Sequence, residues 1–151
     1  MTPVPPPRKF AVIVSKYNDF VTDRLRTGAL AAFAKAGVAA DAVTTVQVPG
    51  AFELPLAARM AAETGEFSAI VCLGCLIRGA TPHFEFIASA VAHGLTSASA
   101  DTAVPITFGV LTTNSAEEAL ERASEGASNK GWEAAASAIE MANVVARFGE
   151  T

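Results

Sequence analysis

KFAVIVS, residues 9–15, is a short apolar run rich in Val and Ile, with prolines before it and the polar residues 16–19 after it. A strand that is buried on both faces of a sheet has this uninterrupted pattern. Apolar and small residues then recur at helical spacing over residues 21–36, and Gly37 ends the run. Side chains that can cap this helix are Asn18, Asp19 and Thr22. The stretch therefore predicts a buried strand followed by a helix.

The same alternation continues along the rest of the chain. Further strands are predicted over residues 42–48, 69–76 and 104–111. Further helices are predicted over residues 52–63, 82–96, 115–124 and 131–148. Strands that alternate with helices form a parallel sheet with helices on both faces. We predict one layered α/β domain over residues 9–151, with a four-stranded, flavodoxin-like parallel sheet, after a flexible proline-rich segment over residues 1–8.

Length and composition agree with one domain that associates with other subunits. The chain has 151 residues, of which 51% are hydrophobic and 17% are charged. This length suits a single hydrophobic core, and the composition is too apolar for a disordered chain. A chain with this many apolar residues is expected to leave part of them on its surface, and contacts between subunits would bury that surface.

The charge balance and the cysteine count exclude several classes of protein. Eleven Lys and Arg against 15 Asp and Glu give a net charge of -4, which disfavours a nucleic-acid partner. No stretch approaches the roughly 18 apolar residues of a membrane-spanning helix, and residues 1–10 lack the apolar centre of a signal peptide. Two cysteines are too few for a disulfide scaffold. We expect a cytoplasmic protein without a membrane partner.

GCLIRGATPH, residues 74–83, is the strongest local motif, because a strand runs there through a glycine turn into a helix. Thr81 fits the N-cap and Pro82 the first helical position. Free amide groups at residues 79–81, together with the helix dipole, predict a site for an anion such as phosphate. The alternative is an ordinary strand-to-helix turn. The spacing imitates a nucleotide-binding P-loop, but Ala80 replaces the lysine that such loops require.

His83 falls in the first turn of that helix. The positive end of the helix dipole disfavours the charged imidazolium there and keeps the ring neutral. A neutral imidazole beside an anion site can transfer protons, so His83 is the candidate general acid or base. The alternative is a surface or capping histidine.

Cys72 and Cys75, together with the His83-Phe84-Glu85 triplet, superficially resemble zinc-binding motifs. The order of the motifs is wrong for a zinc deaminase. Two cysteines three positions apart on a strand also point to opposite faces of the sheet and cannot share one metal ion. We therefore predict neither a metal site nor a cofactor.

Two other segments carry candidate binding residues. VPGAFELP, residues 48–55, places Phe52 and Glu53 at the ligand-binding edge of the sheet, where the ring can stack on a heterocycle and the carboxylate can accept a hydrogen bond. The alternative is a hydrophobic staple beside a first-turn acid. Arg122 and Lys130 flank a turn between the last two helices, and either can contact phosphate or remain a solvated surface charge.

Four motifs, over residues 48–55, 73–85, 108–112 and 129–131, together resemble the lumazine synthase family. The resemblance extends over residues 9–148. It implies that 5-amino-6-(D-ribitylamino)uracil condenses with 3,4-dihydroxy-2-butanone 4-phosphate, in riboflavin biosynthesis, to give 6,7-dimethyl-8-ribityllumazine, phosphate and water. The substrates themselves carry this chemistry, and the resemblance implies a transferase without a cofactor.

The resemblance also implies roles for individual residues. Tyr17 matches the aromatic residue that stacks on the pyrimidine, although phenylalanine is more usual at this position. The other residues implied around the ring and the ribityl chain are Ala51, Phe52, Glu53, Cys75, Leu76 and Ile77. Ala80 and Thr81 match the phosphate-side loop, and His83 matches the proton-transfer histidine.

By the same resemblance, a neighbouring subunit supplies Phe108, Arg122 and Lys130 to each active site, with Arg122 holding the phosphate. The assembly implied is a homopentamer, or a 60-subunit icosahedral capsid of such pentamers, with riboflavin synthase as a candidate partner. The short turn at residues 125–129 is compatible with a capsid but lacks the lysine often seen there, so pentamer and capsid both stay open.

Two other functions are compatible with the same motifs. An archaeal-type riboflavin synthase has a related fold but needs no phosphate site, so Arg122 and the turn at residues 79–81 argue against it. A non-catalytic flavin-binding or lumazine-binding protein would need the aromatic residues only, and the presence of His83 argues against that function.

Overall fold

The computed structural model describes residues 8–149. Four strands form one parallel sheet in the order β2-β1-β3-β4, and they are β1 (Phe10–Ser15), β2 (Val43–Val48), β3 (Ala69–Ile77) and β4 (Ile106–Thr113). The helices are α1 (Asp19–Lys35), α2 (Leu54–Glu63), α3 (His83–Thr102), α4 (Ala116–Arg122) and α5 (Lys130–Gly149). This confirms the predicted fold class. The predicted flexible segment lies, except for Arg8, outside the described residues.

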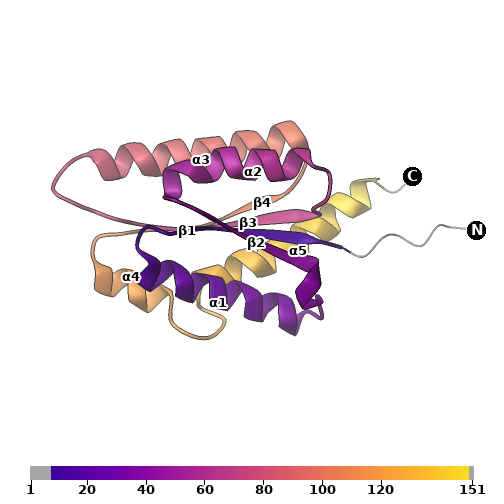
Figure 1. Cartoon of the computed structure of the whole chain (residues 1–151), viewed down its shortest axis with the longest axis horizontal. Helices are drawn as coiled ribbons and strands as arrows, with labels where there is room; N and C mark the ends of the chain where they lie inside the picture. The colour runs from indigo at the N-terminus through magenta and orange to yellow at the C-terminus, as the bar shows by residue number, and fades with distance from the viewer. Residues whose placement is uncertain (1–7, 150–151) are drawn as a thin grey trace, which may run out of the picture.

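The sheet is the middle of three layers (Figure 1). Helices α2 and α3 cover one face, and helices α1, α4 and α5 cover the other. All six residues of β1 are buried, because this strand lies inside the sheet and is covered on both faces. The uninterrupted apolar pattern of residues 9–15 has this burial as its physical cause.

The two cysteines lie on opposite sides of the sheet, as predicted. Cys72 packs in the core beneath α2 and α3, whereas Cys75 packs in the core beneath α1 and α5. No helix in the described part of the chain has the length and apolar character needed to cross a membrane.

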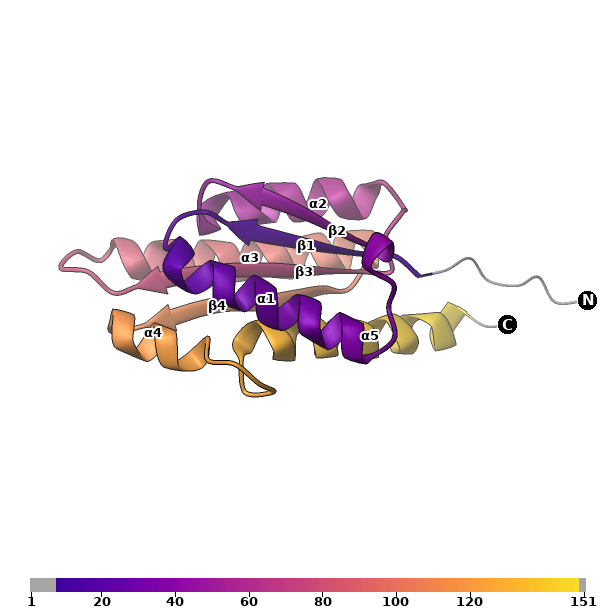
Figure 2. The same cartoon turned by 60° about the horizontal axis from the view of Figure 1, so that its bottom comes forward.

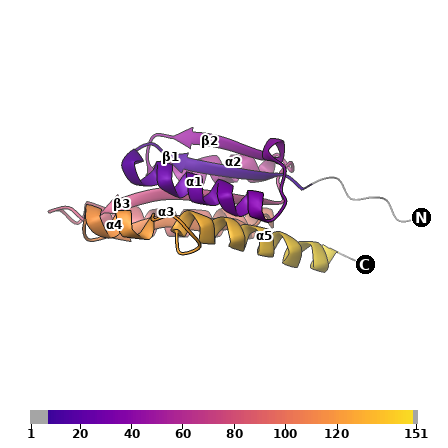
Figure 3. The same cartoon turned by 90° about the horizontal axis from the view of Figure 1, so that it is seen from below.

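Helices α1 and α5 lie side by side on one face (Figure 3) and approach each other closely at two glycines. A Cβ atom on Gly131 would lie 1.9 Å from the carbonyl oxygen of Leu25. A Cβ atom on Gly28 would lie 2.2 Å from Oδ1 of Asn129. The start of α5 therefore packs directly against the backbone of α1.

The predicted start of α3 was wrong by one position. Thr81 is not the N-cap, because Pro82 occupies that position and its carbonyl accepts bonds from the amides of Glu85 (3.1 Å) and Phe86 (3.4 Å). The helix therefore begins at His83.

The predicted ends of two elements were also displaced. Helix α3 continues past residue 96 because Ala98 extends its buried stripe, and it stops where Ala103 adopts a left-handed conformation at φ 59°. Strand β4 begins at Ile106 rather than Val104, because Pro105 has no amide hydrogen for the sheet.

Candidate active site

The carboxyl ends of all four strands meet at one edge of the sheet, where ligands bind in folds of this kind. Figure 2 shows the loop between β3 and α3 extending beyond this edge. At the same edge, the amide of Tyr17 donates to the carbonyl of Pro49 over 3.1 Å and joins the turn after β1 to the turn after β2. Two aromatic side chains are open to solvent on these joined turns, Tyr17 at 71% exposure and Phe52 at 63%.

Asn18 fixes the turn that carries Tyr17. Its backbone adopts a left-handed conformation at φ 64°, and Nδ2 donates to the carbonyl of Cys75 over 2.9 Å. The sequence offered Asn18 only as a helix cap, and it does occupy the N-cap position of α1, but its side chain makes no capping bond. It instead connects the turn after β1 to the end of β3.

The remaining residues predicted around the ring differ in their burial. Glu53, Leu76 and Ile77 are half-buried at the edge. Ala51 and Cys75 are buried in the core, so their side chains contribute packing beneath the edge. Burial raises the pKa of the Cys75 thiol to about 11 and that of the Cys72 thiol to about 12. Both thiols are therefore protonated and unreactive near neutral pH.

The predicted anion loop is open to solvent. Residues 79–81 are exposed, and none of their backbone amides donates a hydrogen bond within the described part of the chain. His83 is the first residue of α3 and is also exposed. Unpaired amide groups and the positive end of a long helix can bind an anion close to this imidazole.

Arg78 holds the base of this loop, a role that no sequence motif predicted. Its Nε donates to Oδ1 of Asn114 over 3.1 Å, its Nη1 lies 3.0 Å from Oε1 of Glu85, and its guanidinium lies 5.0 Å from the centre of the Phe84 ring. The side chain thus connects the end of β3 to the start of α3 and to the turn after β4. In the sequence, the sign of this role is Glu85, an acid seven residues after Arg78 that also belongs to the zinc-like His83-Phe84-Glu85 triplet.

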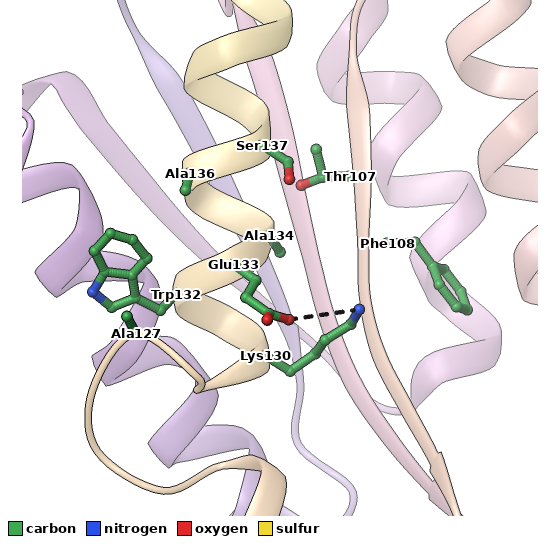
Figure 4. Close-up of a pocket in the computed structure, with 9 residues that line it drawn as sticks. All are labelled: Thr107, Phe108, Ala127, Lys130, Trp132, Glu133, Ala134, Ala136 and Ser137. Atoms are coloured by element: carbon green, nitrogen blue, oxygen red, sulfur yellow. Dashed lines mark ion pairs between the residues drawn. The ribbon is translucent and has the colours of Figure 1, made fainter.

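Phe108 and Lys130 lie away from this edge of the sheet. They line a hollow of about 570 Å³ beside β4 and α5, together with Thr107, Ala127, Trp132, Glu133, Ala134, Ala136 and Ser137. Figure 4 shows the Lys130 amine extending toward β4, 4.0 Å from Oε2 of Glu133. In the register of the sheet Phe108 pairs with Cys72. A strand advances ~3.3 Å per residue, so Phe108 lies about 16 Å from the edge residue Ile77.

Arg122 is the last residue of α4. Its guanidinium is exposed and lies 3.7 Å from Oε1 of Glu118, one turn earlier in the same helix. A surface pair of this kind is weak, so it leaves the guanidinium available to another anion.

The structure therefore divides these predicted residues into two groups and one separate residue. The first group, at the sheet edge, contains Tyr17, Phe52, Glu53, Ala80, Thr81 and His83. The second group, away from that edge, contains Phe108 and Lys130, and Arg122 stands apart at the end of α4. Among residues 8–149, no three His, Cys, Asp or Glu side chains gather closely enough to hold a metal ion.

Comparison with known proteins identifies the family. A sequence model described as 6,7-dimethyl-8-ribityllumazine synthase matches residues 7–146. The protein of that name from Syntrophus aciditrophicus (strain SB) is 51% identical over 137 residues, which cover 91% of this chain and 89% of the relative. Its namesake from Desulfosudis oleivorans (strain DSM 6200 / JCM 39069 / Hxd3) is 51% identical over 138 residues, covering 91% and 88%. That from Desulfatibacillum aliphaticivorans is 44% identical over 141 residues, covering 93% and 91%. The chain belongs to the 6,7-dimethyl-8-ribityllumazine synthase family.

Proposed function

We propose that this enzyme condenses 5-amino-6-(D-ribitylamino)uracil with 3,4-dihydroxy-2-butanone 4-phosphate to form 6,7-dimethyl-8-ribityllumazine, in active sites shared between subunits. Family membership over almost the whole chain supports the reaction. The substrates are small polar or charged molecules, and we infer that the enzyme acts on them in the cytoplasm.

In the proposed site the edge group binds the heterocycle and moves protons. Tyr17 and Phe52 offer exposed rings on joined turns, a suitable arrangement for stacking on a flat pyrimidine. Glu53 lies beside them as an acceptor for the ring or the ribityl chain, and the backbone near Cys75, Leu76 and Ile77 forms the floor.

The phosphate binds, in this proposal, to the free amides of residues 79–81. The substrate amine attacks the ketone and loses water to form an imine, and phosphate then leaves by elimination to give an enol, which tautomerises to a ketone. The ribitylamino nitrogen attacks this carbonyl and closes the ring with loss of a second water. Each step transfers a proton, and His83 is the exposed group next to the anion loop that can do so. Arg122 and Lys130 of a second copy complete the phosphate site.

One observation carries the proposal that two subunits share each site. Phe108 and Lys130 face the hollow beside β4 and α5, and Phe108 lies about 16 Å from the edge that carries Tyr17 and Phe52. One subunit therefore cannot bring Phe108 and the edge residues Tyr17 and Phe52 to one small substrate. A second copy, docked with its hollow against the edge, can.

An apolar helix face supports association with further copies. Leu56 and Met60 stand one turn apart on α2 and are 67% and 62% exposed, and Phe52 lies just before this helix. Large apolar side chains gathered on one helix face favour burial against another subunit. A ring of five subunits, alone or within a 60-subunit capsid, accommodates such a head-to-tail contact.

The purified protein tests the proposal directly. It is mixed with the two substrates, and the fluorescence of the lumazine product is followed. Product formation supports the proposed reaction. Formation of riboflavin from supplied lumazine would instead indicate a riboflavin synthase, and binding without turnover would indicate a carrier protein.

A further inference from the structure

Asn129 is a buried polar residue in the turn between α4 and α5, with only 2% of its surface exposed. Its Oδ1 accepts the amides of Gly131 (2.8 Å) and Trp132 (3.1 Å). Its Nδ2 donates to the carbonyls of Ala123 (3.0 Å) and Arg24 (3.3 Å). The side-chain amide thus uses both donor hydrogens and accepts two bonds.

These four bonds fix three elements relative to one another. The two bonds to Oδ1 cap the start of α5, whose first residue is Lys130. The bond to Ala123 holds the residue that directly follows Arg122 at the end of α4. The bond to Arg24 anchors the whole turn to α1.

The surrounding backbone is shaped to receive this side chain. A Cβ atom on Gly28 would lie 2.2 Å from Oδ1 and 2.5 Å from Cγ of Asn129, so α1 has room for the amide only because residue 28 is glycine. Asp is as large as Asn but has no donor for the carbonyls of Ala123 and Arg24. Ser can cap α5 but is too short to reach them.

We propose that Asn129 is a positioning residue for phosphate, acting through Arg122 and Lys130. This inference rests on the proposed function, which assigns these two cations to the phosphate of the substrate. Asn129 does not touch the substrate. It holds the two backbone segments that carry the cations at a fixed separation, across the turn of residues 123–129.

The backbone must fix the positions of the two cations, because the contacts of their own side chains do not. Among residues 8–149, the partners that hold Arg122 and Lys130 are limited to surface ion pairs of 3.7 Å with Glu118 and 4.0 Å with Glu133. Such pairs contribute little to fixing a long side chain. A small displacement of a binding group weakens its interaction with the substrate strongly.

The decisive variant is Asn129→Ser, which keeps an acceptor for the α5 cap and removes the link to Ala123. We expect the KM for the butanone phosphate to rise roughly tenfold, and the inhibition constant of inorganic phosphate to rise with it. The KM for the ribitylaminouracil should stay within about twofold, because Tyr17 and Phe52 are untouched. Asn129→Asp keeps the size and the acceptor, and it should likewise raise the KM for the butanone phosphate and not the KM for the ribitylaminouracil.

A double variant tests whether the effect passes through the cations. Because Asn129 is proposed to act through Arg122 as well as Lys130, Asn129→Ser should raise the phosphate KM less in an Arg122→Ala background than in the unmodified enzyme. Full additivity would overturn the proposal. So would equal increases in both KM values, or a failure of both Asn129 variants to assemble, since the residue would then serve folding alone.

Ser99→Ala is the matched control. It removes a hydrogen bond of 2.8 Å from the Ser99 hydroxyl to the carbonyl of Val104, at the C-terminal end of α3 and outside the turn between α4 and α5. It should lower the melting temperature without changing the ratio of the two KM values. The proposed function fails separately, if the unmodified enzyme forms no lumazine. If the enzyme does form lumazine and Asn129→Ser behaves like Ser99→Ala, only the positioning role is lost.

Discussion

His83 is the exposed first residue of α3 and follows residues 79–81, whose amides donate no hydrogen bond to any of residues 8–149. His83→Ala should lower kcat by roughly 10-fold to 1000-fold, because a positioned acid or base contributes about that much and the substrates react partly by themselves. Lumazine fluorescence under saturating substrates measures it. His93→Ala, an exposed histidine further along α3, is the control. An unchanged kcat would remove His83 from proton transfer.

Arg122 is predicted to act on one substrate only. Arg122→Ala should raise the KM for the butanone phosphate by ~30-fold, or on the order of 2 kcal/mol, while the KM for the ribitylaminouracil changes little. Arg26→Ala is the matched control, because Arg26 makes a comparable surface pair of 3.6 Å with Asp23. Equal changes in both KM values would contradict a phosphate-binding role.

The buried thiols should make stability depend on alkaline pH. Burial raises the pKa of Cys75 to about 11 and of Cys72 to about 12, against an ordinary value of 9.0 in the unfolded chain. The two thiols contribute fully to the stability of the folded chain below pH 9. This contribution is lost as the pH rises toward 11 or 12, because the unfolded chain loses its thiol protons first. The free energy of unfolding should fall by about 1.4 kcal/mol per pH unit for each thiol in that window.

Urea titrations between pH 8 and pH 11 measure this slope. A Cys72→Ala, Cys75→Ala double variant provides the reference, because it retains every other titrating group. If the two proteins show the same slope, the thiols do not carry the effect.

At the scale of elements, the order of strands and helices was predictable but several element ends were not. Burial of β1 on both faces leaves a pattern that a sequence displays directly. The end of α3 depends on Ala103, a residue type that rarely adopts positive φ and gives no warning of it. The start of α3 depends on which carbonyl, that of Thr81 or of Pro82, accepts the first helical bond.

In the candidate site, too, some residues were predictable from the sequence and others were not. Aromatic and charged residues within a single motif, such as Phe52 and His83, were found from the sequence. The roles of Arg78 and Asn129 were not predicted, and for Asn18 only its N-cap position was, because each side chain bonds to a residue far along the chain. Contacts of that kind follow from the fold and leave no local pattern.

The close approach of α1 and α5 sets a limit on residue 131. Gly131→Ala would place a methyl group 1.9 Å from the Leu25 carbonyl, so one of the two helices must move. The free energy of unfolding should fall by at least about 2 kcal/mol, measured by urea denaturation. Gly149→Ala is the control, because no atom lies within 4 Å of its added Cβ among the described residues. Equal stability of the two variants would show that this packing is loose.

At the scale of the whole molecule, a shared site predicts that two defective subunits can repair each other. A ring refolded from equal amounts of His83→Ala and Arg122→Ala chains should contain about one quarter of sites in which both residues are native. Activity should therefore exceed the average of the two parents, at low phosphate substrate where each alone is slow. Activity equal to that average would place both residues in the same subunit's site.

The outer strand β2 has a consequence for chains that have not yet found partners. Its sequence, VTTVQV, is uncharged and rich in β-branched residues, four of its six residues are exposed, and within residues 8–149 it pairs on one side only, with β1. An open strand edge of this composition readily adds another strand in the wrong register and begins an aggregate. An unassembled subunit is thus inactive and also prone to precipitate. A cell that makes this chain benefits from rapid assembly, or from a chaperone that covers the edge of β2 until assembly is complete.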